Sequence, residues 1–279
     1  MTNIKNEYRA LVANLLQSGQ DKDDRTETGT KSLFGRQIVH NMELGFPLLT
    51  GKKMYFNHAV VELLWILQGR TDIGYLHENN VHYWDDDYKR SGRKDGTLGP
   101  VYGAQWRDFN GYDQLMELIY NISVNPSSRR HIISAWAPHK LKNMVLPPCH
   151  YAMQVNINNN KMDLLWVQRS ADVFLGLPYD IAMYGLLLEL LCHNTEYKPG
   201  KLIAQLGDCH LYNNHLKAAN EFIYREDTSE LPTIKISGDG FKFRGGRENP
   251  DVIIPKKKHI QLINYKPLPP IKAKLNVGK

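Results

Sequence analysis

Cysteine is scarce in this sequence of 279 residues, with only Cys149, Cys192 and Cys209. An odd number of cysteines excludes a framework in which all are paired, and their wide spacing does not fit a zinc site. We therefore expect at least one free thiol, and we expect no metal.

Long hydrophobic runs are also absent. The longest apolar stretches, such as residues 185–192, are too short to span a bilayer, and residues 1–9 contain no apolar segment typical of a signal peptide. We expect a soluble protein of the cytoplasm, or of the host cytoplasm if the protein is viral.

Net charge is small outside the C-terminal tail. The formal charge is +6, and residues 251–279 hold seven lysines against one acidic residue, so the rest of the chain is close to neutral. A nucleic-acid-binding protein that uses this tail and the pair Arg129 and Arg130 is an alternative, but no known nucleic-acid-binding motif supports it.

The remaining composition is that of an ordinary globular protein, with 42% hydrophobic and 23% charged residues. No internal repeat or linker divides the chain, so we expect one catalytic domain over residues 1–279.

Hydrophobic periodicity and turn residues predict a mixture of helices and strands. Helices are expected at residues 6–16, 58–68, 178–192 and 215–224, and strands at 32–40, 131–136, 151–157, 162–168 and 202–206. Residues 21–30 are expected to form a loop, and the asparagines at 158–160 a hairpin turn. Without strict alternation of strand and helix, this order favours an α+β fold.

Cys149 is the first candidate for chemistry. Pro147 and Pro148 stiffen the chain before it, and a strand is expected directly after it, so the thiol is held in one direction. A lone cysteine is more often an inert, buried residue, and reactivity requires nearby positive charge. The arginines that qualify are Arg25, Arg129, Arg130 and Arg169.

Other polar residues form weaker candidates. Glu62 is the one charged residue in an apolar helical stretch, where a structural ion pair and a general acid or base are equally reasonable. Arg169 and Ser170 are side by side at a strand end and suit a phosphate. His210 and Tyr212 share one face of an extended segment and suit a sugar hydroxyl, although a buried histidine is more often structural.

Taken together, these motifs resemble the thymidylate synthase family in order and spacing over nearly the whole chain. The matching segments, read directly from the sequence, are DRTETGT at 24–30, ELLW at 62–65, LHENNV at 76–81, LGPVYG at 98–103, PPCH at 147–150, QRSADVFLGLP at 168–178 and HLY at 210–212.

The resemblance implies a thymidylate synthase-like fold with a large mixed sheet, covered by helices, at the interface of a homodimer. It implies a pyrimidine deoxynucleotide as substrate and 5,10-methylenetetrahydrofolate as co-substrate. The partner's Arg129 and the partner's Arg130 would reach across the interface into the site.

The resemblance also assigns roles to residues of this chain. Cys149 would attack C6 of the pyrimidine, assisted by a catalytic group formed by Glu62, Tyr102, His150, Asp172 and Asp180. The nucleotide would bind through Arg25, Arg129, Arg130, Gln168, Arg169, Ser170, Gly176, Asp180, His210 and Tyr212. The folate would bind against Glu62, Trp84, Asp172, Leu175, Gly176 and Tyr179.

Asp180 departs from the family pattern, in which an asparagine reads the edge of uracil. An ionised carboxylate has no donor for O4 of uracil, whereas cytosine offers an amino group there. The alternative is that Asp180 only favours a helix N-terminus. With the family resemblance, Asp180 indicates dCMP as substrate, as in the deoxycytidylate hydroxymethylase branch of the family.

A second departure concerns the product. Trp84 is present, as in methylating members, but Asp87 replaces a second tryptophan, and Gly278 and Lys279 extend the usual terminus. A less closed site favours water as the final acceptor, so we expect dCMP hydroxymethylation. Methylation of dUMP to dTMP, or of dCMP, is the alternative.

Overall fold

The computed structural model describes residues 2–193, 195–238, 242–244 and 251–276. Among these residues, the helices are α1 (Ile4–Ser18), α2 (Phe56–Leu67), α3 (Ile73–Glu78), α4 (Asp85–Arg90), α5 (Tyr102–Arg107), α6 (Gln114–Val124), α7 (Leu177–His193) and α8 (Leu216–Tyr224). The strands are β1 (Gln20–Lys22), β2 (Thr30–Asn41), β3 (Ile132–Ser134), β4 (His150–Asn158), β5 (Lys161–Asp172), β6 (Lys198–Tyr212), β7 (Thr233–Ile236), β8 (Lys242–Arg244), β9 (Asp251–Ile253) and β10 (Ile260–Ile263).

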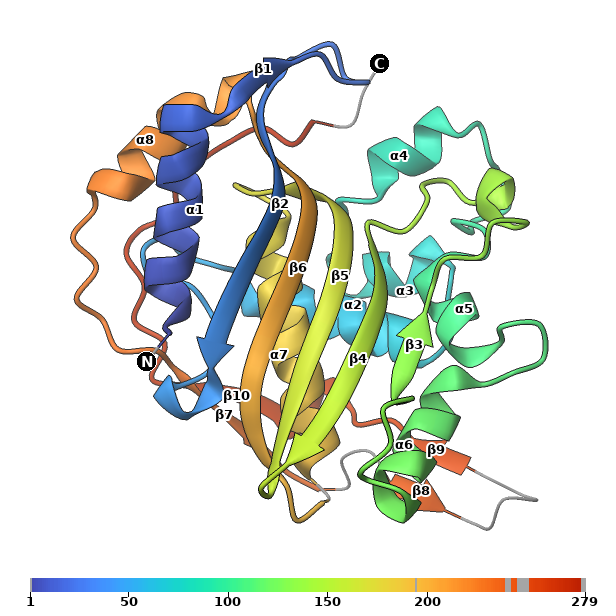
Figure 1. Cartoon of the computed structure of the whole chain (residues 1–279). Coiled ribbons are helices and arrows are strands. Elements are labelled where there is room, and N and C mark those ends of the chain that lie inside the picture. Colours follow the sequence, from blue (N-terminus) through green and yellow to red (C-terminus); the bar gives the residue numbers. More distant parts are fainter. Residues whose placement is uncertain (1, 194, 239–241, 245–250, 277–279) are drawn as a thin grey trace.

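The main sheet has the strand order β1-β2-β6-β5-β4-β3 (Figure 1). The central strands β5 and β6 run parallel, and their neighbours pair with them antiparallel. Two further pairs, β7 with β10 and β8 with β9, lie apart from this sheet. The predicted α+β class with a large mixed sheet is confirmed.

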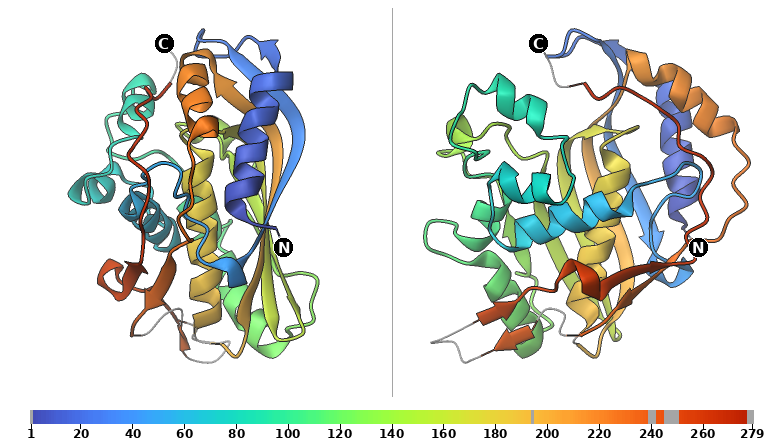
Figure 2. Two further views of the ribbon diagram at one scale, coloured as in Figure 1. Left: turned by 90° about the vertical axis from the view of Figure 1, so that its left-hand side faces the viewer. Right: turned by 180° about the vertical axis from the view of Figure 1, so that it is seen from behind.

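Helices gather on one face of the sheet, as the side view in Figure 2 shows. Helix α7 packs against β5, β6 and α2, and it is apolar on almost every side, which is typical of a helix enclosed by its neighbours. The other face of the sheet is not covered by helices in Figure 1. Phe34 on β2 is 82% exposed.

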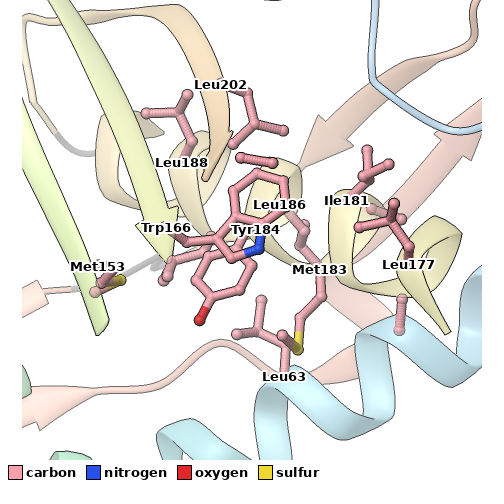
Figure 3. Close-up of a cluster of buried hydrophobic side chains, with 14 of the residues drawn as sticks. Leu63, Met153, Trp166, Leu177, Ile181, Met183, Tyr184, Leu186, Leu188 and Leu202 are labelled. Carbon is pink, nitrogen blue, oxygen red and sulfur yellow. The ribbon is translucent and has the colours of Figure 1, made fainter. Parts of the chain in front are cut away.

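Alternation along β5 places every second side chain under α7. Met162, Leu164, Trp166 and Gln168 are buried on this face. Trp166 stacks on Tyr184 of α7 with ring centroids 4.9 Å apart, inside the apolar cluster of Figure 3. The core therefore ends in a polar residue, Gln168, at the point where the sheet meets the start of α7.

Gly207 allows β6 to approach β5 at the same level. A Cβ atom at this position would lie 2.8 Å from the carbonyl oxygen of Arg169. Because only glycine avoids this contact, the two strands can pair closely here and place Ser170 opposite Asp208.

Several predicted boundaries were wrong. The first two residues of the expected loop at 21–30 belong to β1, in which Asp21 pairs with Lys31 of β2 and their side chains form an ion pair. Strand β6 extends far beyond residues 202–206, since it is hydrogen-bonded on both sides. Strand β3 covers only part of residues 131–136, and α8 begins after a 3-10 turn at residues 213–215.

The hairpin and the main helices were predicted correctly. Strands β4 and β5 meet at the expected asparagines, and Asn159 and Asn160 have the positive φ angles that this turn requires. The sequence analysis did not identify α3, α4, α5 and α6 or the two small sheets. Within the described part of the chain, no helix is both long and apolar enough to cross a membrane.

Candidate active site

A cavity of about 600 Å³ opens where β5 and β6 end, beside the start of α7. Its walls include every predicted site residue except Arg129 and Arg130. Those two arginines are exposed, just before β3, and do not line the cavity of their own chain.

Cys149 is held at the entrance of β4. Its backbone N–H donates to the hydroxyl oxygen of Tyr102 at 2.9 Å. Arg169 donates to the carbonyl oxygens of Pro147 and Pro148 at 2.8 and 3.0 Å, so its guanidinium fixes the segment that the two prolines stiffen. The chain is therefore restrained on both sides of the thiol.

The thiol of Cys149 has one close cation. Arg169 Nη2 lies 3.9 Å from Sγ. Burial nevertheless raises the pKa of Cys149, and the nearby charges of Asp180 and Asp87 add to this effect, while Arg169 and Arg25 oppose it. Neutralising either carboxylate therefore favours the thiolate.

Asp180 lies in the first turn of α7 and lines the cavity. Gln168 Nε2 donates to Asp180 Oδ2 at 2.8 Å and to the carbonyl oxygen of Ser170 at 3.0 Å. Trp166 Nε1 donates to Gln168 Oε1 at 3.1 Å. Because an indole N–H can only donate, it fixes the amide of Gln168 and keeps Asp180 Oδ2 an acceptor.

Burial raises the pKa of Asp180 to about 7, and the charges of Glu62 and Asp172 act in the same direction against the Gln168 hydrogen bond. Asp180 is therefore a carboxylic acid in a substantial fraction of molecules at neutral pH. Because Oδ2 accepts from Gln168, Oδ1 is the oxygen that is free to carry the proton.

His150 forms the next part of this buried network. Its ring stacks on Tyr102 with centroids 4.2 Å apart, Nδ1 is 2.9 Å from the hydroxyl of Tyr184, and Nε2 is 4.0 Å from Asp180 Oδ1. Burial lowers the pKa of His150 to about 3, so the imidazole is neutral. Trp166 and Tyr184 are stacked on each other in Figure 3. The indole N–H of Trp166 holds Gln168, and the hydroxyl of Tyr184 holds His150.

Glu62 stands on the opposite wall, on α2. Tyr83 donates its hydroxyl to Oε2 at 2.7 Å, and Trp84 Nε1 donates to Oε1 at 3.1 Å. Burial raises the pKa of Glu62, although both hydrogen bonds favour the ionised form. The alternative of a structural ion pair does not apply to the partners found here, which are both neutral.

His210 and Tyr212 share one face of β6, as the alternation predicts, with ring centroids 5.2 Å apart. Asp208, two residues earlier on the same face, lies 3.3 Å from His210 Nδ1 and pairs with Lys22. Arg25, Arg169 and Ser170 line the cavity close to this face.

Polar wall residues that were not predicted as site residues include Tyr83, Asp87 and Asp208. Tyr83 occupies one oxygen of Glu62, Asp87 pairs with Arg90, and Asp208 lies beside His210. Asp208 was detectable from strand alternation with His210 and Tyr212. Tyr83 and Asp87 depend on the positions of α3 and α4, which the pattern did not predict.

These features define a class of enzyme: a transferase with a half-buried thiol, arginines that suit a phosphate, and flat aromatic walls. The chain belongs to the thymidylate synthase family, whose model, described as Thymidylate synthase, matches residues 6–277.

Relatives named thymidylate synthase are similar to it over 97% of this chain and 99% of their own length. They come from Mycoplasma mobile (39% identical), Enterobacteria phage T4 (40%) and Francisella tularensis subsp. holarctica (41%).

Membership in this family establishes the general reaction. The protein is a transferase that carries out one-carbon transfer to C5 of a pyrimidine, with methylenetetrahydrofolate as co-substrate. Proteins of this family act on a nucleotide and a folate, and they are generally dimeric.

Proposed function

We propose that this enzyme hydroxymethylates dCMP at C5. The observation that carries the choice of base is Asp180, an acid in the cavity wall whose side chain is 17% exposed and whose pKa is raised to about 7. An asparagine here would donate to O4 of uracil and accept from N3–H. Asp180 instead offers one proton that can be shared.

Cytosine complements this acid in two ways. Its N3 accepts a proton, and its N4 amino group donates to the second carboxylate oxygen. Transfer of the proton to N3 produces a positive ring against a carboxylate, with two parallel charge-assisted hydrogen bonds. Uracil already carries a hydrogen on N3 and forms no such ion pair, so this activation is specific to cytosine.

A protonated cytosine ring is more electrophilic at C6, where Cys149 adds as the nucleophile. When Asp180 transfers its proton to N3, the ring becomes positively charged. This positive charge stabilises the negative charge that the thiolate of Cys149 brings to the ring. Tyr102 and His150 hold the geometry around this step. We assign the 5′-phosphate to Arg25, Arg169 and Ser170 and the sugar hydroxyl to His210 and Tyr212.

The outer part of the cavity fits the folate. Trp84 and Tyr179 offer flat aromatic surfaces, Leu146 and Leu175 add apolar area, and Asp172 and Glu62 supply carboxylates. Methylenetetrahydrofolate supplies the carbon that is transferred. Glu62, held by Tyr83 and Trp84, is positioned to direct proton transfers through water at this end.

Water as the final acceptor is supported by the polarity of the outer wall. Asp87 lines the cavity where other members of the family place a tryptophan, and Tyr83 adds a hydroxyl. A polar wall retains water near the transferred carbon. Gly278 and Lys279 lie outside the residues that the structure describes.

The second candidate is thymidylate synthase, which methylates dUMP to dTMP. The names of the relatives at 39–41% identity favour it, and Trp84 is retained. A neutral Asp180 can imitate asparagine by donating O–H to O4 and accepting from N3–H. A third possibility is a dCMP methylase, which would act on cytosine like the first candidate and add a methyl group like the second.

We also propose a homodimer in which the uncovered sheet face is the interface. Phe34 of the main sheet is an exposed large apolar residue. Arg129 and Arg130 do not line the cavity of their own chain, so the partner's Arg129 and the partner's Arg130 would complete the phosphate site.

One incubation separates the candidates. Purified protein is mixed with methylenetetrahydrofolate and either dCMP or dUMP, while product mass and the absorbance of dihydrofolate are followed together. We expect dCMP to gain a hydroxymethyl group without formation of dihydrofolate. A methyl group on dUMP with equal dihydrofolate identifies thymidylate synthase, and a methyl group on dCMP identifies the methylase.

A further inference from the structure

Three metal-binding side chains converge outside the cavity. His77 lies in the last turn of α3, His82 lies in the segment that follows, and Asp85 begins α4. Their ligand atoms all lie within 4.8 Å of one another. None of the three lines the active-site cavity, so the cluster is separate from the site described above.

The geometry is close to that of a metal site. His77 Nε2 is 2.6 Å from Asp85 Oδ1, His82 Nδ1 is 3.2 Å from Asp85 Oδ2, and the two imidazole rings stack with centroids 4.9 Å apart. Ligands of a tetrahedral Zn²⁺ with bonds of about 2.0–2.1 Å lie about 3.3 Å from each other. Small side-chain rotations therefore bring all three atoms to bonding distance.

We propose that His77, His82 and Asp85 bind a divalent transition-metal ion of the zinc class. Two imidazole nitrogens and one carboxylate suit such an ion, whereas Mg²⁺ and Ca²⁺ prefer oxygen ligands. The side chains are partly exposed, with 39%, 58% and 26% of their surface accessible, so the ion enters from solvent and water completes its coordination.

The bound ion would brace the wall that holds Glu62. Between the ligands His82 and Asp85 lie only Tyr83 and Trp84, the two donors to the Glu62 carboxylate. Fixing the residues on both sides restricts the backbone of both donors. The ion thus acts as a positioning device, and it takes no part in the one-carbon transfer, which uses no metal.

A simple ion-pair cluster is the competing explanation, and metal titration distinguishes the two. Zn²⁺ binding is measured by calorimetry in a Cys149→Ser background, so that the active-site thiol does not capture the ion. Into this background we place His82→Ala, Asp85→Asn and, as a matched control, His139→Ala, which removes an exposed histidine elsewhere. Co²⁺ in place of Zn²⁺ gives a visible spectrum that reports the ligand set.

We expect one Zn²⁺ per chain in the background protein and in His139→Ala. Loss of a ligand exceeds the effect of losing a supporting hydrogen bond, so His82→Ala and Asp85→Asn should weaken binding by more than about tenfold. Equal binding in all four proteins, or no stoichiometric binding in the background protein, would overturn the site.

Hydrogen exchange tests the link to the wall. In the Cys149→Ser background, Zn²⁺ should slow amide exchange in residues 79–88, and it should leave exchange unchanged when His82→Ala is added to that background. Because His82 is largely exposed, this variant is expected to fold. Binding of Zn²⁺ with unchanged exchange in residues 79–88 would contradict the bracing role.

Discussion

The two ends of the cavity are built differently. The base end, formed by Asp180, Gln168 and His150, is attached to long elements and to the stacked pair Trp166 and Tyr184. The outer wall, formed by Tyr83, Trp84 and Asp87, belongs to a turn and to α4, a helix of six residues. A helix of this length depends on its tertiary contacts for stability.

The enzyme selects a base, and it selects the final acceptor of the transferred carbon. The difference between the two ends assigns these two selections to different parts of the cavity. The base end is buried and its hydrogen bonds fix one another, so a wrong base leaves polar groups unpaired at high cost. The outer wall is held by fewer polar contacts, from Tyr83 and Trp84 to Glu62 and from Asp87 to Arg90, and it belongs to short elements. We infer that base choice is set rigidly, whereas the fate of the transferred carbon is adjustable.

The largest expected effect comes from Asp180→Asn. The amide cannot transfer a proton to cytosine N3 but can donate to O4 of uracil, so the ratio of kcat/KM for dCMP over dUMP should fall by about 10⁴-fold. Steady-state kinetics with each nucleotide measure the ratio. The exposed Asp86→Asn on α4 is the control, and a ratio unchanged in Asp180→Asn contradicts the assignment.

The same substitution should change stability with pH. The carboxyl of Asp180 has a pKa of about 7 in the folded state and about 3.9 in the unfolded state, so the wild type loses stability as pH rises through this window. Asp180→Asn should therefore be more stable than wild type at pH 8, by up to about 4 kcal/mol.

Denaturant unfolding at pH 5 and pH 8 measures how the stability difference between Asp180→Asn and the wild type depends on pH. The advantage of Asp180→Asn should shrink on going to pH 5, where most wild-type molecules keep the proton. An advantage that is independent of pH would show that Asp180 is ionised in both conditions.

Trp166→Phe should loosen the base end. The change removes the donor that orients Gln168, so base discrimination should fall by about tenfold, the effect of a hydrogen bond worth about 1–1.5 kcal/mol. Trp106→Phe removes equal volume from another buried site, outside the cavity lining. Equal discrimination in both variants would break the proposed link between core and base end.

The smallest effect is expected at the outer wall. Asp87→Trp restores an apolar group where the family has tryptophan and excludes water, so hydride transfer should begin to compete with hydration and dihydrofolate should accompany a measurable fraction of the product. Asp86→Trp places the same side chain on the exposed face of α4. A change in base preference in Asp87→Trp would contradict the separation of the two ends.

Much of the fold was predictable because local patterns coincide with burial. The alternation in β5, the asparagine turn and the apolar α7 each identify an element without tertiary information. The limits of β6 were not predictable, since they depend on pairing with both neighbours. Short helices such as α3 and α4 carry too few periodic residues to be recognised.

For the site, the motifs predicted which residues meet but not how their charges interact. The position of Arg169 near Cys149 was expected, yet burial outweighs it and raises the pKa of the thiol. The orientation of Gln168 depends on Trp166 and the protonation of Asp180 on its burial, and both are properties of the packed structure.

The most direct test of proton sharing is the ¹⁵N resonance of cytosine N3 in dCMP labelled at that atom and bound without folate. We predict that the resonance moves toward the protonated position in the wild-type complex at pH 6 and remains at the unprotonated position in Asp180→Asn. An unprotonated N3 in the wild-type complex would contradict the account of how this enzyme selects its base.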